Sequence, residues 1–257
     1  MAVSSNVLGI VLKTYDLGEK DKILVLLTAT SYSPNSVLLT REQGKLRVAA
    51  KGARRPGGRS AALEPLVEVQ AAIYPGKSLY TLTQSALVTS HRLVREQLDR
   101  LAYGLFMAEL LDLFTVDAEA RPASYDLLSQ ALTHLEEDQP EAVLAYFETH
   151  LLRQMGLLPA WQACISCQTT ESRLVALNLP EGGLVCAACA QKLGGVPLTE
   201  ETILLLQFFA QVGWEGYGTV DAGALAPKLA KVLEQFIFYQ LSGRPRSYDF
   251  LNSLRHL

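Results

Sequence analysis

A chain of 257 residues with 49% hydrophobic residues is long enough to bury one large core or two modest ones, which argues against intrinsic disorder. Its net charge of -3 is unevenly distributed, because residues 1–85 carry 11 Lys and Arg against 6 Asp and Glu, whereas residues 86–257 carry 12 against 20. No basic segment followed by an apolar run opens the chain, and no window reaches the roughly 18 apolar residues of a membrane helix, so we expect a soluble cytoplasmic protein.

Short apolar and β-branched runs separated by turn residues fill the first third of the chain. They are VLGIVLKTY (7–15), KILVLLT (22–28), NSVLLT (35–40), KLRVAAKG (45–52), LVEVQAAIYPG (66–76) and LYTLTQ (79–84). Five or six strands at this spacing predict a small barrel or sandwich. The sequence VLLT occurs twice, at 25–28 and 37–40, which indicates a small duplication or a loop insertion.

After about Thr89 the hydrophobic period changes from two to about 3.6, which predicts helices. We expect them at about 101–114, 124–136, 140–156, 200–212, 227–241 and 248–254. Pro140 suits the first turn of its helix, and Gly156 suits a C-terminal cap. The pattern therefore predicts a β domain of about 85 residues followed by a helical domain.

All four cysteines lie in one segment of the predicted helical domain, as two C-x-x-C pairs separated by 18 residues: Cys164, Cys167, Cys186 and Cys189. This spacing is typical of a zinc ribbon. Four thiolates complete a tetrahedron, so we predict a structural rather than a catalytic Zn²⁺. The alternatives are a thioredoxin-type redox site, which lacks a βαβ unit here, and two disulfides, which need an oxidising compartment.

A second segment, between residues 41 and 59, is strongly basic and holds a single acidic residue, Glu42. Its basic residues are Arg41, Lys45, Arg47, Lys51, Arg54, Arg55 and Arg59. Lys45 and Arg47 alternate on a predicted strand, so both point to one face and are placed to contact one phosphate backbone. The alternative is an edge strand that charge protects from pairing with other chains.

The sequence carries no pattern typical of a catalytic site. PGKS (75–78) and GARRPGG (52–58) each resemble part of a phosphate loop, but Ala71 replaces the first glycine of one, and Gly58 replaces the lysine of the other. The histidines are scattered and form no metalloprotease motif, and the serines form no nucleophile elbow. We therefore expect a binding protein and not an enzyme.

Several segments resemble the bacterial RecO family of DNA repair and recombination proteins. They are GIVLKTYDLGEKDKILVLLT, GKLRVAAKGARRP, LEPLVEVQAAIYPGKSLYTLTQSAL, LDRLAYGLFMAELLD and the paired C-x-x-C, in the family's order over nearly the whole chain. The resemblance implies an α+β protein. An N-terminal OB-fold barrel would span residues 1–88, and a mainly α-helical domain would span residues 89–257, with a zinc-binding ribbon inserted at about 161–195.

The resemblance also implies a function. RecO-like proteins bind single- and double-stranded DNA and anneal complementary strands. With RecR they assist loading of RecA onto strands coated with single-stranded-DNA-binding protein (SSB), in the cytoplasm at the nucleoid. By this resemblance, the basic residues from Arg41 to Arg59 become DNA contacts, and the four cysteines become ligands of a structural zinc ion.

One segment departs from the family. ATSYSPNSVLLT (29–40) separates two segments that nearly adjoin in other members, and it either enlarges a DNA-facing loop or lengthens a solvent turn. Two rival functions stay open from the residues alone. One is a helical protein-interaction scaffold with structural zinc and no direct DNA role, and the other is a zinc-dependent nucleic-acid enzyme.

Overall fold

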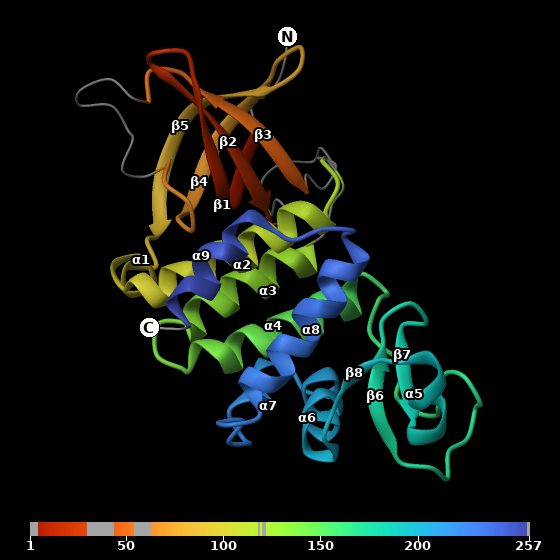
Figure 1. Ribbon diagram of the computed structural model, residues 1–257. Coiled ribbons are helices and arrows are strands. Elements are labelled where there is room, and N and C mark those ends of the chain that lie inside the picture. The colour runs from red at the N-terminus through yellow and green to blue at the C-terminus, as the bar shows by residue number, and fades with distance from the viewer. Residues whose placement is uncertain (1–4, 30–43, 54–62, 118, 120–121, 256–257) are drawn as a thin grey trace, which may run out of the picture. The chain divides into compact units, whose positions relative to one another are not determined.

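The computed structural model describes residues 5–29, 44–53, 63–117, 119 and 122–255 (Figure 1). The chain divides into two compact units, one of residues 1–136 with 247–257 and one of residues 137–246. The strands of the first unit end at Thr89, beside the expected domain boundary at residue 88. The compact unit extends further because the next three helices and the C-terminal helix belong to it. The predicted strand at 35–40 and its VLLT repeat lie outside the described residues.

Five strands of the first unit close into a barrel in the order β1-β2-β3-β5-β4. Neighbouring strands are antiparallel, except that β3 and β5 pair in parallel over two residues. This arrangement confirms the predicted OB-like barrel. The strands are β1 (Ser5–Leu17), β2 (Asp21–Thr28), β3 (Lys45–Ala50), β4 (Glu68–Pro75) and β5 (Tyr80–Thr89).

Alternate side chains of these strands fill the barrel, as a two-residue period requires. Leu24 and Leu26 of β2 meet Leu46 and Val48 of β3 in this core, and all four are fully or almost fully buried. The short apolar runs of the sequence therefore predicted these strands, and Val25 and Leu27, on the other face of β2, are buried as well.

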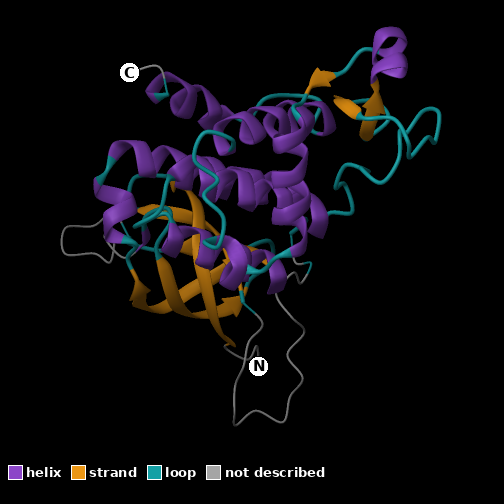
Figure 2. Cartoon of the chain, turned by 90° about the horizontal axis from the view of Figure 1, so that it is seen from below, coloured by secondary structure: helices purple, strands orange, loops and turns teal. Residues whose placement is uncertain are grey.

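Four described helices belong to the first unit; Figure 1 shows them below the barrel, whose strands are orange in Figure 2. They are α1 (Arg92–Glu96), α2 (Leu98–Phe114), α3 (Pro122–His134) and α9 (Arg246–Leu254). Helix α2 is buried over most of its circumference, since it packs against both β1 and α3. The backbone amide of Ser247 at the start of α9 donates to the Glu109 carboxylate of α2, which ties the C-terminal helix to this unit.

The second unit combines helices with a small three-stranded sheet. Its strands are β6 (Leu174–Asn178), β7 (Gly183–Cys186) and β8 (Val196–Pro197), in the order β7-β6-β8. Its helices are α4 (Pro140–Gln154), α5 (Ala187–Leu193), α6 (Glu200–Gln211), α7 (Trp214–Tyr217) and α8 (Ala226–Gln240). Tyr146 of α4 lies at the centre of an aromatic core, with ring centroids 4.2 Å from both His150 and Trp214. Among the described helices, none is long and apolar enough to cross a membrane.

The packing of α2 yields a test at Gly104. A Cβ atom at this position would lie 2.6 Å from Leu66 Cδ1 and 3.2 Å from Val94 Cγ1. Replacing a helical glycine by alanine ordinarily stabilises a protein by about 0.5–1 kcal/mol. We expect Gly104→Ala instead to destabilise the protein by about 1–3 kcal/mol, because the added methyl overpacks this contact.

The measurement is chemical denaturation followed by circular dichroism. Gly218→Ala is the matched control, since its φ is -80° and nothing lies within 4 Å of the added Cβ. The control should change stability by no more than about 0.5 kcal/mol. A Gly104→Ala protein as stable as the parent would contradict the close packing of α2.

Candidate nucleic-acid interface and metal site

Three of the seven basic residues expected to contact DNA lie within the described residues. Lys45 and Arg47 belong to β3, and Lys51 follows in the turn after it, with an exposed side chain. The other four lie outside the described residues: Arg41, Arg54, Arg55 and Arg59. Strand β3 and the turn after it therefore form the described part of the basic segment.

Lys45 is buried, with a side chain only 7% exposed. Its Nζ donates to the backbone oxygens of Asp112, at 2.6 Å, and Thr115, at 2.7 Å. The third partner is Asp112 Oδ1 at 3.1 Å. An ammonium group has three donors, and all three are directed at the C-terminal end of α2, where unsatisfied carbonyls favour a cation.

This environment does not fit the expectation that Lys45 contacts a DNA backbone. Its ammonium group has no donor left for a phosphate, and the alternation that brought Lys45 and Arg47 to one face did not reveal how deeply Lys45 lies. Lys45 instead fastens β3 to the end of α2. The first unit thus joins residues on both sides of the expected domain boundary at 88.

Arg47 differs from Lys45 because its side chain is 56% exposed. Its Nε donates to Asp117 Oδ2 at 2.8 Å, and Lys45 Nζ lies 3.5 Å from the other carboxylate oxygen of Asp117. Arg47 and Lys45 therefore do share a face of β3. Asp117 is brought beside them by an isolated bridge that pairs it with Lys45.

Five charged side chains form a connected group, named here the β3–α2 ion network: Lys13, Lys45, Arg47, Asp112 and Asp117. Burial alone would raise the pKa of Asp112, but the ammonium groups of Lys13 and Lys45 outweigh burial and lower this pKa below its usual range. Sequence reasoning missed both acids, because they follow Lys45 by about 70 residues and match no motif.

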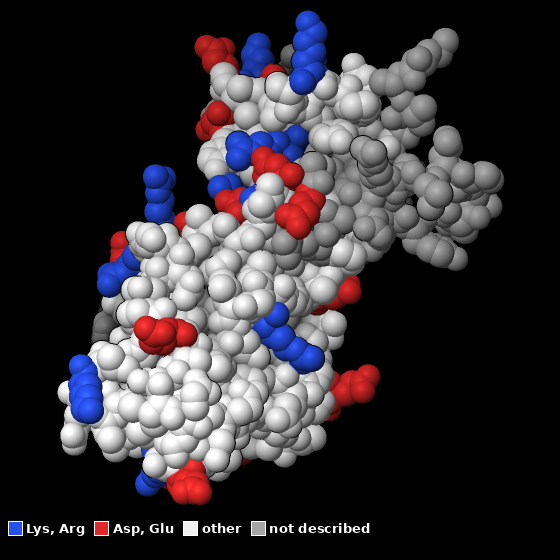
Figure 3. Space-filling view, turned by 90° about the vertical axis from the view of Figure 1, so that its right-hand side faces the viewer, with Lys and Arg blue, Asp and Glu red and all other residues white. Residues whose placement is uncertain are grey.

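The network mixes both signs of charge, and so does one face of the molecule. On the face displayed in Figure 3, Lys and Arg side chains adjoin Asp and Glu side chains in the upper part of the molecule. The described residues form no broad area of one sign on this face. The basic excess of the first third of the chain is therefore offset on β3 by acids from a later segment.

The four cysteines form a compact cluster at the base of the small sheet. Cys164 and Cys167 precede β6, Cys186 ends β7, and Cys189 lies in α5. Their sulfur atoms all lie within 4.8 Å of one another, and none forms a disulfide. A tetrahedron with metal–sulfur distances of about 2.3 Å has edges of about 3.8 Å. The distance between Cys167 Sγ and Cys186 Sγ is 3.8 Å.

The pKa values of two of these thiols shift in opposite directions. Burial raises the pKa of Cys164, but backbone hydrogen bonds from Cys167, Cys186 and Ser166 outweigh it and lower this pKa to about 6. For Cys189 a hydrogen bond with Ser166 lowers the pKa, but interactions with the other cysteines and burial raise it to about 11. Four thiolates this close repel one another unless a metal ion neutralises them. The donor set therefore fits a thiophilic metal ion.

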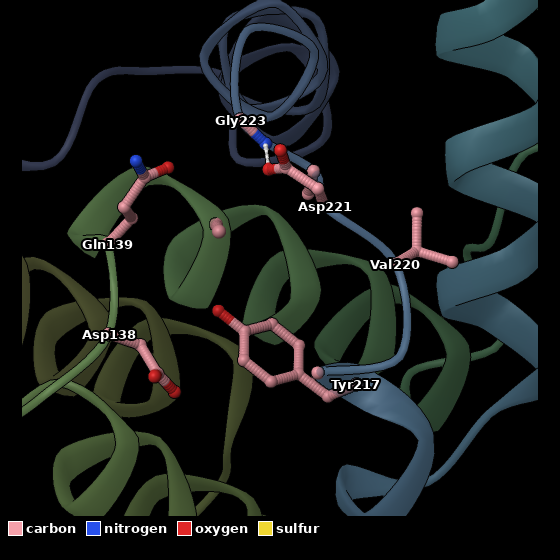
Figure 4. A pocket seen from close by; sticks show the side chains of 9 residues that line it. Asp138, Gln139, Tyr217, Val220, Asp221 and Gly223 are labelled. Atoms are coloured by element: carbon pink, nitrogen blue, oxygen red, sulfur yellow. Dashed lines mark hydrogen bonds between the residues drawn. The ribbon is translucent and has the colours of Figure 1, made fainter.

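A separate cavity of about 170 Å³ lies in the second unit (Figure 4). Asp138, Gln139, Tyr217 and Asp221 line it, and the hydroxyl of Tyr217 points toward the side where Asp138 and Gln139 lie. Burial and the Asp138 carboxylate raise the pKa of Tyr217 above its usual range. Two carboxylates make this cavity unsuited to phosphate, so it is no part of a nucleic-acid site.

Along nearly its whole length the chain is similar to proteins of known type. Residues 37–91 match the family described as "Recombination protein O N terminal", and residues 95–249 match "Recombination protein O C terminal". The DNA repair protein RecO of Exiguobacterium sibiricum is 32% identical over 254 residues, covering 97% of this chain and 96% of the relative. That of Symbiobacterium thermophilum is 33% identical over 259 residues, covering 97% of each.

The β3–α2 ion network yields a stability test. We expect Lys45→Met to destabilise the protein by about 3 kcal/mol, because it leaves two buried carbonyls without a donor and removes one of the two lysines that bond Asp112. Arg47→Ala, on the same face of the same strand, should cost at most about 1 kcal/mol, since its ion pair is exposed. Urea unfolding of both variants provides the measurement. Equal losses from the two substitutions would show that Lys45 has no special structural role.

Proposed function

Because the chain belongs to the RecO family of DNA repair proteins, we propose that its barrel binds single- and double-stranded DNA and anneals complementary strands. The observation that carries the proposal is the position of β3. This strand lies in an OB-like barrel, presents Arg47 to solvent and is followed directly by exposed Lys51. OB-folds commonly track a nucleic-acid backbone along a basic surface.

In this proposal the DNA contacts are Arg47, Lys51 and the basic residues that flank β3 in the sequence: Arg41, Arg54, Arg55 and Arg59. Lys45 is left out because its three donors are occupied at the end of α2. Contacts of this kind neutralise phosphates and release counterions, so affinity falls steeply as salt rises. They read no base edges, so sequence preference should be weak.

The proposed mechanism makes and breaks no covalent bond. Complementary strands held on one basic surface meet at high local concentration, and base pairing then supplies the free energy of annealing. By membership in the family, we further propose that the protein acts with RecR to assist RecA loading on SSB-coated strands, in the cytoplasm at the nucleoid. Annealing of SSB-coated complementary strands, with and without RecR, tests this step.

We also propose that the four cysteines hold a metal ion, that this ion is Zn²⁺ and that its role is structural. Four sulfur ligands leave no open position for a reacting water. Cys164 and Cys186 are buried, and the small sheet around them contributes few other core residues. The metal would therefore supply much of the stability of this ribbon, as in other small zinc-dependent folds.

The DNA proposal is tested by reversing charge at Arg54 and Arg55. Arg54→Glu with Arg55→Glu should weaken binding of a labelled single strand at least tenfold, for all sequences alike, and should reduce its salt dependence. Fluorescence anisotropy in rising salt provides the measurement. Lys228→Glu with Lys231→Glu is the control for charge alone, because both lysines are exposed on α8 in the other compact unit.

Two results would count against this proposal. Unchanged binding in the double variant would move the DNA contacts elsewhere. Absence of salt-dependent binding by the parent protein would favour a helical interaction scaffold with no direct role on DNA.

The metal proposal is tested by Cys186→Ser. We expect the variant to lose bound zinc and the ribbon to unfold at lower temperature, because three thiolates hold the ion less tightly than four. Elemental analysis and thermal unfolding of the same preparation provide the measurements. Chelation of the parent protein should produce the same loss of stability. A variant with full zinc content would refute the assignment of four cysteine ligands, and turnover of nucleic acid lost on chelation would indicate a catalytic ion.

A further inference from the structure

The ion pair between Arg47 and Asp117 occupies a side chain that the proposed function assigns to DNA. Arg47 is 56% exposed and Asp117 is 43% exposed, so solvent and ligands reach both. Arg47 Nε donates to one oxygen of the Asp117 carboxylate, and a phosphate oxygen accepts the same charge-assisted hydrogen bond. Asp117 thus stands where a DNA phosphate would bind to Arg47.

The two acids of the β3–α2 ion network differ in how firmly they are held. Asp112 lies within α2, its side chain is 9% exposed, and it is bonded by both Lys13 and Lys45. Asp117 follows the end of α2, and a backbone bridge pairs it with Lys45, but its carboxylate lies 3.5 Å from Lys45 Nζ. If this carboxylate turns away, Lys45 retains Asp112 and its two backbone carbonyls. The fold therefore depends on the Asp112 side chain and can release that of Asp117.

We propose that Asp117 is an internal competitor for DNA, a carboxylate that neutralises Arg47 in the free protein and yields it to a phosphate when DNA binds. This inference rests on the proposed DNA-binding function. The exchange replaces one exposed ion pair by another, so it costs little, and phosphate accepts paired hydrogen bonds from arginine. Asp117 would then weaken binding to isolated anions and reserve Arg47 for ligands whose neighbouring phosphates are held by the other basic residues.

The test is a set of DNA-binding measurements on the full chain at one salt concentration. Asp117→Asn keeps the shape of the side chain and removes its charge, and it should tighten binding of a labelled single strand about threefold to tenfold. Asp126→Asn is the matched control, because Asp126 is exposed on α3 in the same unit and its loss changes net charge equally. The control should leave affinity unchanged within about twofold.

The role of Arg47 is isolated by a double-mutant cycle. In an Arg47→Ala background, Asp117→Asn should give no further gain in affinity. If the gain persists there, Asp117 acts through the general field and the proposal is wrong. If Asp117→Asn leaves affinity unchanged while the parent protein binds DNA, the proposal is wrong and the DNA function stands. If the parent shows no salt-dependent binding, both are wrong.

A second readout does not depend on how well the variant folds. The Nε–H resonance of Arg47 in the parent protein should shift when single-stranded DNA is added, as its partner changes from carboxylate to phosphate. An unchanged resonance at saturating DNA would show that the ion pair with Asp117 persists in the complex.

Asp117→Ser, which removes the same charge from a shorter side chain, should tighten binding as Asp117→Asn does.

Discussion

The first unit depends on a buried lysine at the end of a helix. Helix α2 closes with backbone carbonyls that have no partner within the helix, and Lys45 of β3 supplies the donors that they need. A buried ammonium group is costly unless its charge and all of its donors are matched, and the Asp112 carboxylate completes the match. The barrel and the helix that follows it thus become one compact unit.

The same arrangement explains why the basic residues of β3 do not produce a basic surface. Lys45 and Arg47 lie on the same face of β3. Lys45 bonds to Asp112 within the fold, and Arg47 is paired with Asp117. In the proposed function, the DNA contacts therefore fall to Arg47, once it is released, and to basic residues beyond the ends of the strand. Family membership supports DNA repair as the setting. We infer that the ion pair between Arg47 and Asp117 lowers the affinity of the barrel for DNA.

The cysteine cluster is a second, independent constraint. One loop, a hairpin and a short helix bring four sulfurs together in a part of the chain that has few other core residues. Ligand type and spacing alone predicted this cluster, because a C-x-x-C pair brings two sulfurs together locally, whatever surrounds it. Burial raises the pKa of Cys164, but backbone hydrogen bonds outweigh it and lower this pKa, whereas the neighbouring cysteines raise the pKa of Cys189 against a hydrogen bond with Ser166.

The sequence by itself determined the features that depend on residues close together along the chain. The two-residue period of KLRVAA predicted β3 and its faces, Pro140 predicted the start of α4, and the cysteine spacing predicted a metal site. Only the tertiary structure determined whether each charged side chain is buried or exposed and which group it pairs with. Asp112 and Asp117 meet Lys45 and Arg47 across about 70 residues of sequence, and no local pattern reports a contact at that separation. Burial and pairing of a charge depend on what the fold packs against it, so Lys45 became part of the core while Arg47, two residues later, stayed at the surface.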